Sequence, residues 1–422
     1  MAQGPKILFI GDDFTGASDT LATFSRKGLA AELFLDPPRD FPAAGPVGLA
    51  TALRALSPAD IVSQIEHFAP ALMQYQPDVV HYKVCSTFDS APDVGSIGAA
   101  VTALRAVFDP ALVLVIGGQP SLGRYCLFGT LFAADSRGKI HRIDRHPVMQ
   151  NHPVTPMGEA DLTRHLQGQG LALRAVPYTD YTAGFASLAA QFQKAVMMQE
   201  ALLLDAGQSA DLITIGAALN AISFKGRPIL IVGASSVAEA LTAQVTNQPP
   251  PPIVPKQPAP VFAFAGSRSS VTAEQVAQAS RYKPVPLPPE VFLNPAVCAD
   301  LIASVAQDLT QGISVLAHLL PNEDYALSPQ ALAHRSVELV TAVLSDKKPP
   351  IAGLAIAGGD TSSMICHALN LRSLTYLHDM DPGVSLCLGH SKTRASDLVM
   401  MLKGGQVGRP DLFNRFLAEV TV

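Results

Sequence analysis

The sequence predicts an α/β protein of two domains, each built on a largely parallel sheet flanked by helices. A chain of 422 residues exceeds what one ordinary hydrophobic core holds, so two domains are the default expectation. Short continuous apolar runs recur along the chain, each followed by a small-residue turn and then a stretch of helical character. A single proline-dense segment interrupts the chain past its middle.

The apolar runs are the predicted strands. Continuous rather than alternating apolar residues are typical of strands covered on both faces, as in parallel sheets. We expect a helix after each turn, and Ser269, Thr272 and Ser362 are residue types that start helices. The runs are Lys6–Ile10 before Gly11, Leu112–Ile116 before Gly117 and Gly118, Pro228–Val232 before Gly233, Val261–Ala265 before Gly266, and Leu354–Ala357 before Gly358.

The proline-dense segment, residues 246–260, sets the predicted domain boundary. Proline at this density continues neither a helix nor a central strand and forms a semi-rigid spacer. We therefore expect one domain over residues 1–245 and a second over 261–422, with the active site in the cleft between them. A smaller proline cluster, Pro284–Pro289, is predicted to be a loop inside the second domain.

The composition excludes several classes of protein. Apolar residues make up 48% of the chain and charged residues 15%, which predicts well-buried cores and favours an apolar interface in a homodimer. The net charge of −5 and the absence of a basic run with interleaved aromatics argue against nucleic-acid binding. No apolar run is long enough to cross a membrane, and the start of the chain has no signal-peptide pattern. Five scattered cysteines without a C-x-x-C pair indicate free thiols in a reducing cytoplasm.

The strongest indication of chemistry is the acid pair Asp12 and Asp13, directly after the first predicted strand. Ligands bind at the carboxyl ends of strands in open α/β sheets. Adjacent carboxylates repel each other and lose solvation there, so a structural turn would rarely use two. We therefore predict that Asp12 and Asp13 are catalytic residues.

A second polar strand end lies in residues 81–90, where Lys83, Ser86, Thr87 and Asp89 follow an apolar run. A lysine and hydroxyls beside acids suit a small polyhydroxy acid, whose carboxylate the lysine would bind. The alternative interpretation is that Lys83 only neutralises Asp12 or Asp13.

Residues 141–155 form a second candidate anion site, in which Arg145 is the predicted substrate contact. The histidines of this stretch have no metal-site spacing, so solvated loop histidines are the alternative. Glu159 and Asp161 are expected in the opening turn of the next helix, where acids favour the helix dipole, without a catalytic role.

Three glycine-rich turns in the second domain predict a polyphosphate site. Glycine and serine at a helix N-terminus offer free N–H groups, hydroxyls and a positive dipole end to phosphate. For Lys403, a solvated lysine at a helix end is the alternative to a phosphate contact. Neither a Walker G-x-x-x-x-G-K-[ST] motif nor a G-x-G-x-x-G fingerprint opening the first unit occurs. The predicted cofactor-binding residues are Ser267, Ser269, Gly358, Gly359, Asp360, Thr361, Lys403, Gly404 and Gly405.

Taken in order, these motifs resemble the four-carbon acid sugar kinases over essentially the whole chain. The motifs are Gly11–Ala17, Lys83 with Ser86 and Thr87, Gly266 with Ser267, Gly358–Thr361, and Lys403–Gly405. The resemblance implies an N-terminal domain that binds a sugar acid and a C-terminal domain that binds ATP. It also implies phosphorylation of the terminal hydroxyl of threonate, erythronate or 3-oxo-tetronate. It adds Thr15 and Gly16 to the sugar-acid site.

The chain departs from the family at one motif. Many members read Lys-x-Asp-Ser-Thr-Leu-Arg-Gly, whereas this chain has Cys85 in place of the acid and Asp89 in place of the arginine. The change leaves the exact sugar acid open, and 3-oxo-isoapionate, on which some members of the family act, becomes a further candidate substrate.

The predicted reaction is phosphoryl transfer from ATP with Mg²⁺, with one of Asp12 and Asp13 orienting or deprotonating the hydroxyl. Domain closure would exclude water. A haloacid-dehalogenase-like phosphatase is a poor alternative, because aligning Asp13 and Thr15 with its D-x-D-x-T motif places Gly11 at the nucleophile. A sugar-acid sensor that binds both ligands without transfer is the non-enzymatic alternative.

Overall fold

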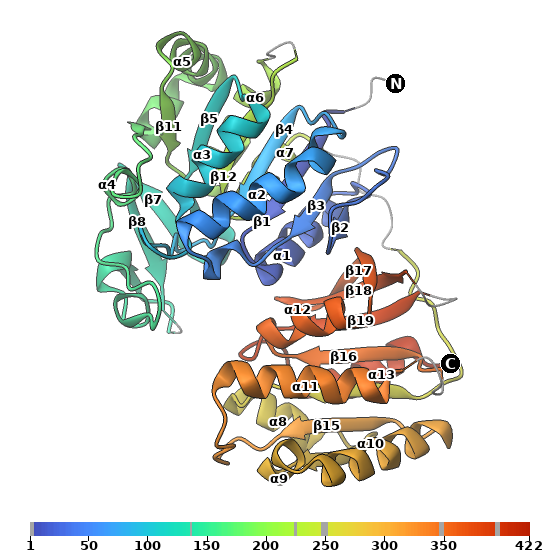
Figure 1. Cartoon of the computed structure of the whole chain (residues 1–422). Helices are drawn as coiled ribbons and strands as arrows, with labels where there is room; N and C mark the ends of the chain where they lie inside the picture. The colour runs from blue at the N-terminus through green and yellow to red at the C-terminus, as the bar shows by residue number, and fades with distance from the viewer. Residues whose placement is uncertain (1–3, 136, 223–225, 246–251, 346–349, 393–396) are drawn as a thin grey trace. The chain divides into compact units, whose positions relative to one another are not determined.

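The chain forms two compact units, Met1–Pro249 and Pro250–Val422 (Figure 1). The computed structural model describes residues 4–135, 137–222, 226–245, 252–345, 350–392 and 397–422. Residues 246–251 of the predicted linker lie outside the described residues. The rest of that segment follows the second unit, because Gln257 N donates to the carbonyl of Val420 at 2.9 Å and Lys256 Nζ to that of Ala418 at 3.3 Å.

The first unit is built on a parallel sheet with the strand order β10-β11-β5-β12-β4-β1-β3-β2. Neighbouring strands pair in parallel throughout this order, as the continuous apolar runs predicted. The strands are β1 (Ile7–Gly11), β2 (Glu32–Phe34), β3 (Val47–Ala50), β4 (Val79–Lys83), β5 (Leu112–Ile116), β10 (Arg174–Val176), β11 (Ala201–Leu204) and β12 (Ile229–Gly233).

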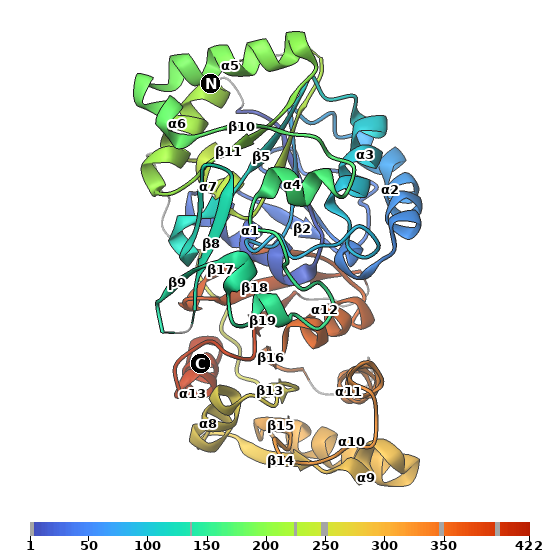
Figure 2. The same cartoon turned by 90° about the vertical axis from the view of Figure 1, so that its left-hand side faces the viewer.

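Helices cover both faces of this sheet (Figure 2). Helices α2 and α3 pack together on one face, and α6 and α7 pack together on the other. Along α2 the buried residues Ile61, Ile65, Phe68 and Leu72 recur at helical spacing and join the core with Leu8. The helices are α1 (Phe14–Arg26), α2 (Pro58–Met73), α3 (Ile97–Phe108), α4 (Leu162–Gln167), α5 (Phe185–Met198), α6 (Ser209–Asn220) and α7 (Ser236–Leu241).

One predicted helix is absent from the first unit. The turn after β5 leads into a small antiparallel sheet, β6-β7-β8-β9, rather than into a helix. The buried positions of β8 alternate, and Gly123 and Gly129 adopt the positive φ angles that tight turns require. The strands are β6 (Gly118–Gln119), β7 (Arg124–Leu127), β8 (Thr130–Ala134) and β9 (Ile140–Arg142).

The second unit contains a mixed sheet with the order β17-β18-β19-β16-β13-β15-β14. Strands β17, β18 and β19 pair antiparallel, whereas β19, β16, β13, β15 and β14 pair in parallel. The strands are β13 (Val261–Ala265), β14 (Lys283–Leu287), β15 (Val315–Leu319), β16 (Gly353–Ala357), β17 (Leu371–Asp381), β18 (Val384–Ser391) and β19 (Leu398–Lys403).

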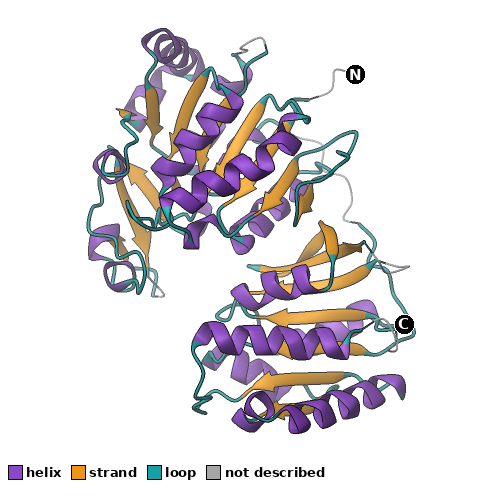
Figure 3. Cartoon of the chain, viewed as in Figure 1, coloured by secondary structure: helices purple, strands orange, loops and turns teal. Residues whose placement is uncertain are grey.

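Helices also cover both faces of the second sheet (Figure 3). Helices α10, α11 and α12 form one layer, and α8 and α13 contact each other on the opposite face. No helix within the described ranges is long and apolar enough to cross a membrane. The helices are α8 (Ser270–Gln278), α9 (Pro289–Leu293), α10 (Pro295–Thr310), α11 (Pro329–Val343), α12 (Gly359–Ala368) and α13 (Leu412–Val420).

The loop predicted at Pro284–Pro289 is wrong. Pro284 and Pro286 belong to β14, the last strand in the order, which pairs only with β15 among the described strands. An edge strand tolerates proline because the missing N–H need not pair on its outer side. Pro289 begins α9, where proline at the first helical position costs no hydrogen bond.

Candidate active site

Main-chain hydrogen bonds fix Asp12 beyond the end of β1. Asp12 N donates to the carbonyl of Lys83 at 2.9 Å, which continues the pairing with β4. On the other side Thr51 N donates to the Gly11 carbonyl at 3.1 Å, and Arg54 N donates to the Asp12 carbonyl at 3.0 Å. The predicted carboxyl-end placement of the acid is therefore confirmed, and the segment after β3 lies against it.

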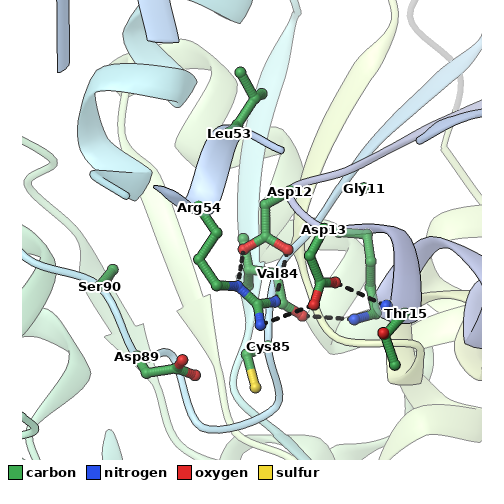
Figure 4. Close-up of polar contacts among 12 residues, drawn as sticks. Gly11, Asp12, Asp13, Thr15, Leu53, Arg54, Val84, Cys85, Asp89 and Ser90 are labelled. Carbon is green, nitrogen blue, oxygen red and sulfur yellow. Dashed lines mark hydrogen bonds and ion pairs between the residues drawn. The ribbon is translucent and has the colours of Figure 1, made fainter. Parts of the chain in front are cut away.

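Arg54 binds both acids of the pair (Figure 4). Its Nε and Nη2 atoms donate to Asp12 Oδ2 at 3.0 Å and Oδ1 at 2.8 Å. Its Nη1 atom lies 3.0 Å from Asp13 Oδ2. This bidentate geometry is the strongest form of arginine–carboxylate pairing and fixes both side chains. The sequence analysis did not identify Arg54; its position just after the apolar run at β3 was the available signal.

Asp12 is buried at the strand end, and Arg54 is partly buried beside it. Burial raises the pKa of Asp12 to about 6, against the lowering effect of the Arg54 charge. Burial disfavours the charge of Arg54, but the facing carboxylates, Asp12 above all, keep its pKa above the ordinary value. Both oxygens of Asp12 are engaged by one guanidinium, so this carboxylate is well suited to hold Arg54 in place.

Asp13 is the more accessible acid of the pair. Its side chain is 31% exposed, compared with 6% for Asp12. As the N-cap of α1 it accepts a 2.7 Å hydrogen bond from Gly16 N at Oδ1. A Cβ atom at Gly16 would lie 2.5 Å from Lys83 Nζ and 2.6 Å from Asp13 Oδ1, so a larger residue here would displace one or both of these side chains. Thr15, the next predicted site residue, is exposed on the same turn.

Lys83 is buried at the end of β4, close to Gly16. Its Nζ atom donates to the Val84 carbonyl at 2.9 Å. In the described part of the chain no ion pair joins Lys83 to either acid, although its charge acts to lower the pKa of Asp12. Arg54 is the cation that pairs directly with both acids, and the two interpretations of Lys83 stay predictions.

The loop after β4 holds the other predicted substrate residues of this strand end. Cys85 Sγ lies 2.9 Å from Thr87 Oγ1, and Thr87 Oγ1 donates to Asp89 Oδ1 at 2.5 Å. Thr87 and Asp89 are buried, whereas Ser86 and Cys85 are partly exposed. In Figure 4 Cys85 lies below the Arg54 guanidinium, and the Asp89 carboxylate points toward the side on which Cys85 lies.

The predicted anion site at residues 141–155 does not join this group among the described residues. The Arg145 side chain is 78% exposed and lies 3.9 Å from Asp144. Asp144 is in turn held by Arg142 at 3.0 and 2.5 Å. Asp161 caps α4, as expected, by accepting from the N–H groups of Thr163 and Arg164.

In the second unit, polar side chains gather where β13, β16 and β19 end side by side. Ser269 caps α8, as predicted, by accepting from Thr272 N at 3.1 Å. The hydroxyls of Ser269 and Thr272 both donate to the Gly405 carbonyl, the latter at 2.9 Å. A Cβ atom at Gly405 would lie 2.3 Å from Ser267 Oγ, whereas one at Gly404 would have no neighbour closer than 3.9 Å.

Lys403 ends β19 at the same place and is buried, so the alternative of a solvated helix-end lysine is wrong. Its Nζ atom donates to Thr272 Oγ1 at 3.0 Å, and burial lowers its pKa to about 8. No ion pair of Lys403 occurs in the described part of the chain. A buried cation without a carboxylate partner suits an anionic ligand.

The turn between β16 and α12 completes this group. Gly358 caps the helix with a φ of 142°, and its N–H donates to the Lys403 carbonyl at 2.9 Å. A Cβ atom at Gly358 would lie 3.4 Å from Thr361 Oγ1. Gly359 begins the helix, which places Ser362 inside the first turn rather than at the start. The side chain of Asp360 lies outside the described residues.

Two family models match the chain. A sugar-binding N-terminal domain matches residues 7–241, and a nucleotide-binding C-terminal domain matches residues 262–413. Over its whole length the chain is similar to a 3-oxo-isoapionate kinase from Paraburkholderia graminis, with 31% identity over 97% of this chain and 93% of the relative. The chain belongs to the four-carbon acid sugar kinase family. The resemblance drawn from its motifs is thereby confirmed, as is the predicted class of enzyme, a sugar-acid kinase.

A second relative in this kinase family has a lower identity. A 3-oxo-tetronate kinase from Cupriavidus necator is 28% identical over 100% of this chain and 98% of the relative. The fold matches crystal structures of a Salmonella typhimurium LT2 protein, with a TM-score of 0.83, and of a Haemophilus influenzae protein, with a TM-score of 0.79. Both are 22% identical; the first match covers 99% of this chain and 100% of the other, the second 96% and 98%. These structures support the α/β fold.

Proposed function

We propose that this sugar-acid kinase transfers the γ-phosphate of ATP to the terminal hydroxyl of a small sugar acid. The candidate acceptors are 3-oxo-tetronate, threonate, erythronate and 3-oxo-isoapionate, the first and last of which are named in its relatives. The observation that carries the proposal is the Asp12–Arg54–Asp13 arrangement, which presents one partly exposed carboxylate from a rigid strand end.

Asp13 is the proposed contact of the reacting hydroxyl. Its carboxylate is held by Gly16 N and Arg54, and its exposed fraction leaves it able to accept a further hydrogen bond. An ordered carboxylate orients a hydroxyl and takes its proton as the new P–O bond forms. Asp12 acts as a positioning residue, since both its oxygens bind Arg54.

The proposed nucleotide site is the group at the ends of β13, β16 and β19. Free N–H groups at the start of α8 and α12, the hydroxyls of Ser267 and Thr361, and the Lys403 ammonium suit the phosphates of ATP. The Gly404–Gly405 turn allows the chain to approach the ligand closely.

Magnesium would enter with the nucleotide. Within the described residues no cluster of three or more His, Cys, Asp or Glu could hold a metal ion. Mg²⁺ is commonly bound through one or two carboxylates, water and substrate phosphates, so the phosphates would supply most of its ligands. When bound, it would neutralise charge that develops on the transferred group.

An ADP-release assay with the candidate acceptors tests the proposal, using the wild type and Asp13→Asn. We expect release with at least one acceptor and a loss of about 10²- to 10⁴-fold in kcat for the variant. Near-normal turnover in Asp13→Asn would refute the assigned role. Stabilisation of the protein by ATP and acceptor without any ADP release would favour the sensor alternative.

A further inference from the structure

Asp89 is a buried carboxylate without a cation. Asp89 is 7% exposed. Among the described residues no arginine, lysine or histidine forms an ion pair with it. In the same part of the chain its hydrogen-bond partners are Thr87 Oγ1, which donates to Oδ1, and the thiol of Cys85. A carboxylate offers about four acceptor positions, so these two partners leave Asp89 able to accept a further hydrogen bond.

Hydrogen bonds from His165 and Gln169 hold the loop that carries Asp89. Phe88, fully buried, has a φ of 54°, an unfavourable left-handed conformation for this residue type. The carbonyl of Phe88 accepts a hydrogen bond from His165 Nε2 at 3.1 Å. Ser90 Oγ lies 3.0 Å from the same nitrogen and accepts from Gln169 Nε2 at 2.8 Å. This network holds the residues on both sides of Asp89 in place.

Two uncharged side chains of the same loop, those of Thr87 and Cys85, contact the Asp89 carboxylate. Thr87 Oγ1 donates to Asp89 and lies 2.9 Å from Cys85 Sγ, and the Cys85 thiol also has a hydrogen bond with Asp89. Burial, followed by the charge of Asp89, raises the pKa of Cys85 to about 11, which keeps the thiol neutral. Thr87 and Cys85 are therefore neutral partners, and the Asp89 side chain keeps capacity to accept another hydrogen bond.

We propose that Asp89 accepts a hydrogen bond from a second hydroxyl of the acceptor, one that is not phosphorylated. The inference rests on the proposed kinase function and deepens it. A carboxylate at this position favours a hydroxyl donor and repels a carboxylate, so the substrate is a polyhydroxy acid whose acid group lies away from Asp89.

The test uses acceptors that differ by one hydroxyl: a trihydroxybutanoate and its 2-deoxy and 3-deoxy analogues. For one analogue, wild type should lose about 10- to 100-fold in kcat/KM, the value of a hydrogen bond to a charged group. Leucine cannot accept a hydrogen bond. In Asp89→Leu the kcat/KM values of the trihydroxybutanoate and of that same analogue should therefore differ by less than about threefold. Glu66→Gln, an exposed acid on α2, is the matched control and should discriminate as wild type does.

Calorimetric binding of the same acceptors separates this inference from the proposed function. Unchanged discrimination in Asp89→Leu, with a wild-type unfolding temperature, overturns the role of Asp89 alone. Acceptor binding that discriminates through Asp89 but releases no ADP overturns only the kinase proposal. If wild type binds no polyhydroxy acid, both are overturned. Asp89→Asn, which retains an acceptor oxygen, serves if Asp89→Leu is unstable, and it should lose part of the discrimination.

Discussion

Arg54 holds Asp12 by two hydrogen bonds, at 3.0 Å from Nε to Oδ2 and at 2.8 Å from Nη2 to Oδ1. The same guanidinium reaches Asp13, so one cation orders two acids of unequal exposure. The two acids therefore differ in role: the buried Asp12 holds the arginine, and the more exposed Asp13 remains available to a ligand.

Removing the Arg54 guanidinium should destabilise the first unit. Arg54→Gln leaves Asp12 buried without its cation, and we expect a loss of about 3 kcal/mol in the free energy of unfolding. The double variant Asp12→Asn with Arg54→Gln should recover most of that loss because no buried charge remains unpaired. Urea denaturation of the three proteins measures both effects. Equal stabilities of the single and double variants would show that the pair is not coupled.

Asp12 should make stability fall with rising pH. Its folded pKa of about 6 exceeds the ordinary 3.8, so the folded state binds more protons between these values. The contribution is therefore fully present below about pH 4 and is lost by about pH 6, with an order of magnitude of about 3 kcal/mol. Unfolding curves of wild type and Asp12→Asn across this range should diverge accordingly. A constant difference between the two proteins contradicts the prediction.

His81 should act in the opposite sense. Burial lowers its pKa from 6.5 to about 3, so its contribution is present above pH 6.5 and is lost as the pH falls through about 3. In His81→Leu the acid limb of the stability curve should flatten by up to about 5 kcal/mol. The Gly233 carbonyl, which His81 Nε2 contacts at 3.1 Å, keeps its bond from Val84 N in the variant. If the unfolding free energy of the variant falls at acid pH as steeply as that of wild type, His81 is not the cause of that fall.

Nucleotide affinity should fall as Lys403 loses its proton. With a pKa of about 8, the Lys403 amine of the nucleotide-free protein is largely deprotonated by about pH 9. ADP binding should therefore be about tenfold weaker at pH 9 than at pH 7. Lys403→Met should bind ADP weakly at both pH values and lose this dependence. Lys283→Met, which removes a lysine paired with Asp308, is the control. Calorimetry would contradict the role of Lys403 if the variant kept the wild-type pH profile.

The two glycines after Lys403 offer a matched pair. An alanine Cβ at Gly405 would lie 2.3 Å from Ser267 Oγ, so Gly405→Ala should displace this serine and weaken ADP binding by at least about tenfold. A Cβ atom at Gly404 meets no protein atom closer than 3.9 Å, so Gly404→Ala leaves Ser267 in place and should weaken ADP binding less than Gly405→Ala does. Equal ADP dissociation constants for the two variants would mean that Ser267 makes no contribution.

Much of the fold was predictable because buried parallel strands read as continuous apolar runs. Leu112–Ile116 and Val261–Ala265 are strands with the predicted bounds. The small antiparallel sheet was missed because two glycines resemble the start of a βα turn. The burial of Thr130–Ala134 alternates in the structure, but its residues 131–134 are all apolar, so the sequence shows no alternation. At β14, proline masked a strand that is possible only at an edge.

The site was predictable where chemistry lies at a strand end and unpredictable where it depends on pairing. Asp12 directly follows a run that reads as a strand, so its position could be inferred. Arg54 lies in a short 3-10 turn, η1 (Leu53–Ala55), with no pattern of its own. Its place beside Asp12 results from the pairing of β1 with β3, which one sequence does not encode locally. The roles of all these residues remain predictions.

Main-chain hydrogen bonds hold the proposed sugar-acid site at the end of β1. They run from Asp12 to Lys83, from Thr51 to Gly11 and from Arg54 to Asp12. None of these bonds depends on which side chain occupies positions 85 or 89. Evolution can therefore exchange Cys85 or Asp89 without rebuilding the scaffold, and an engineer can do the same. Positions 85 and 89 are accordingly the natural sites at which to retune a kinase of this family toward a different acid.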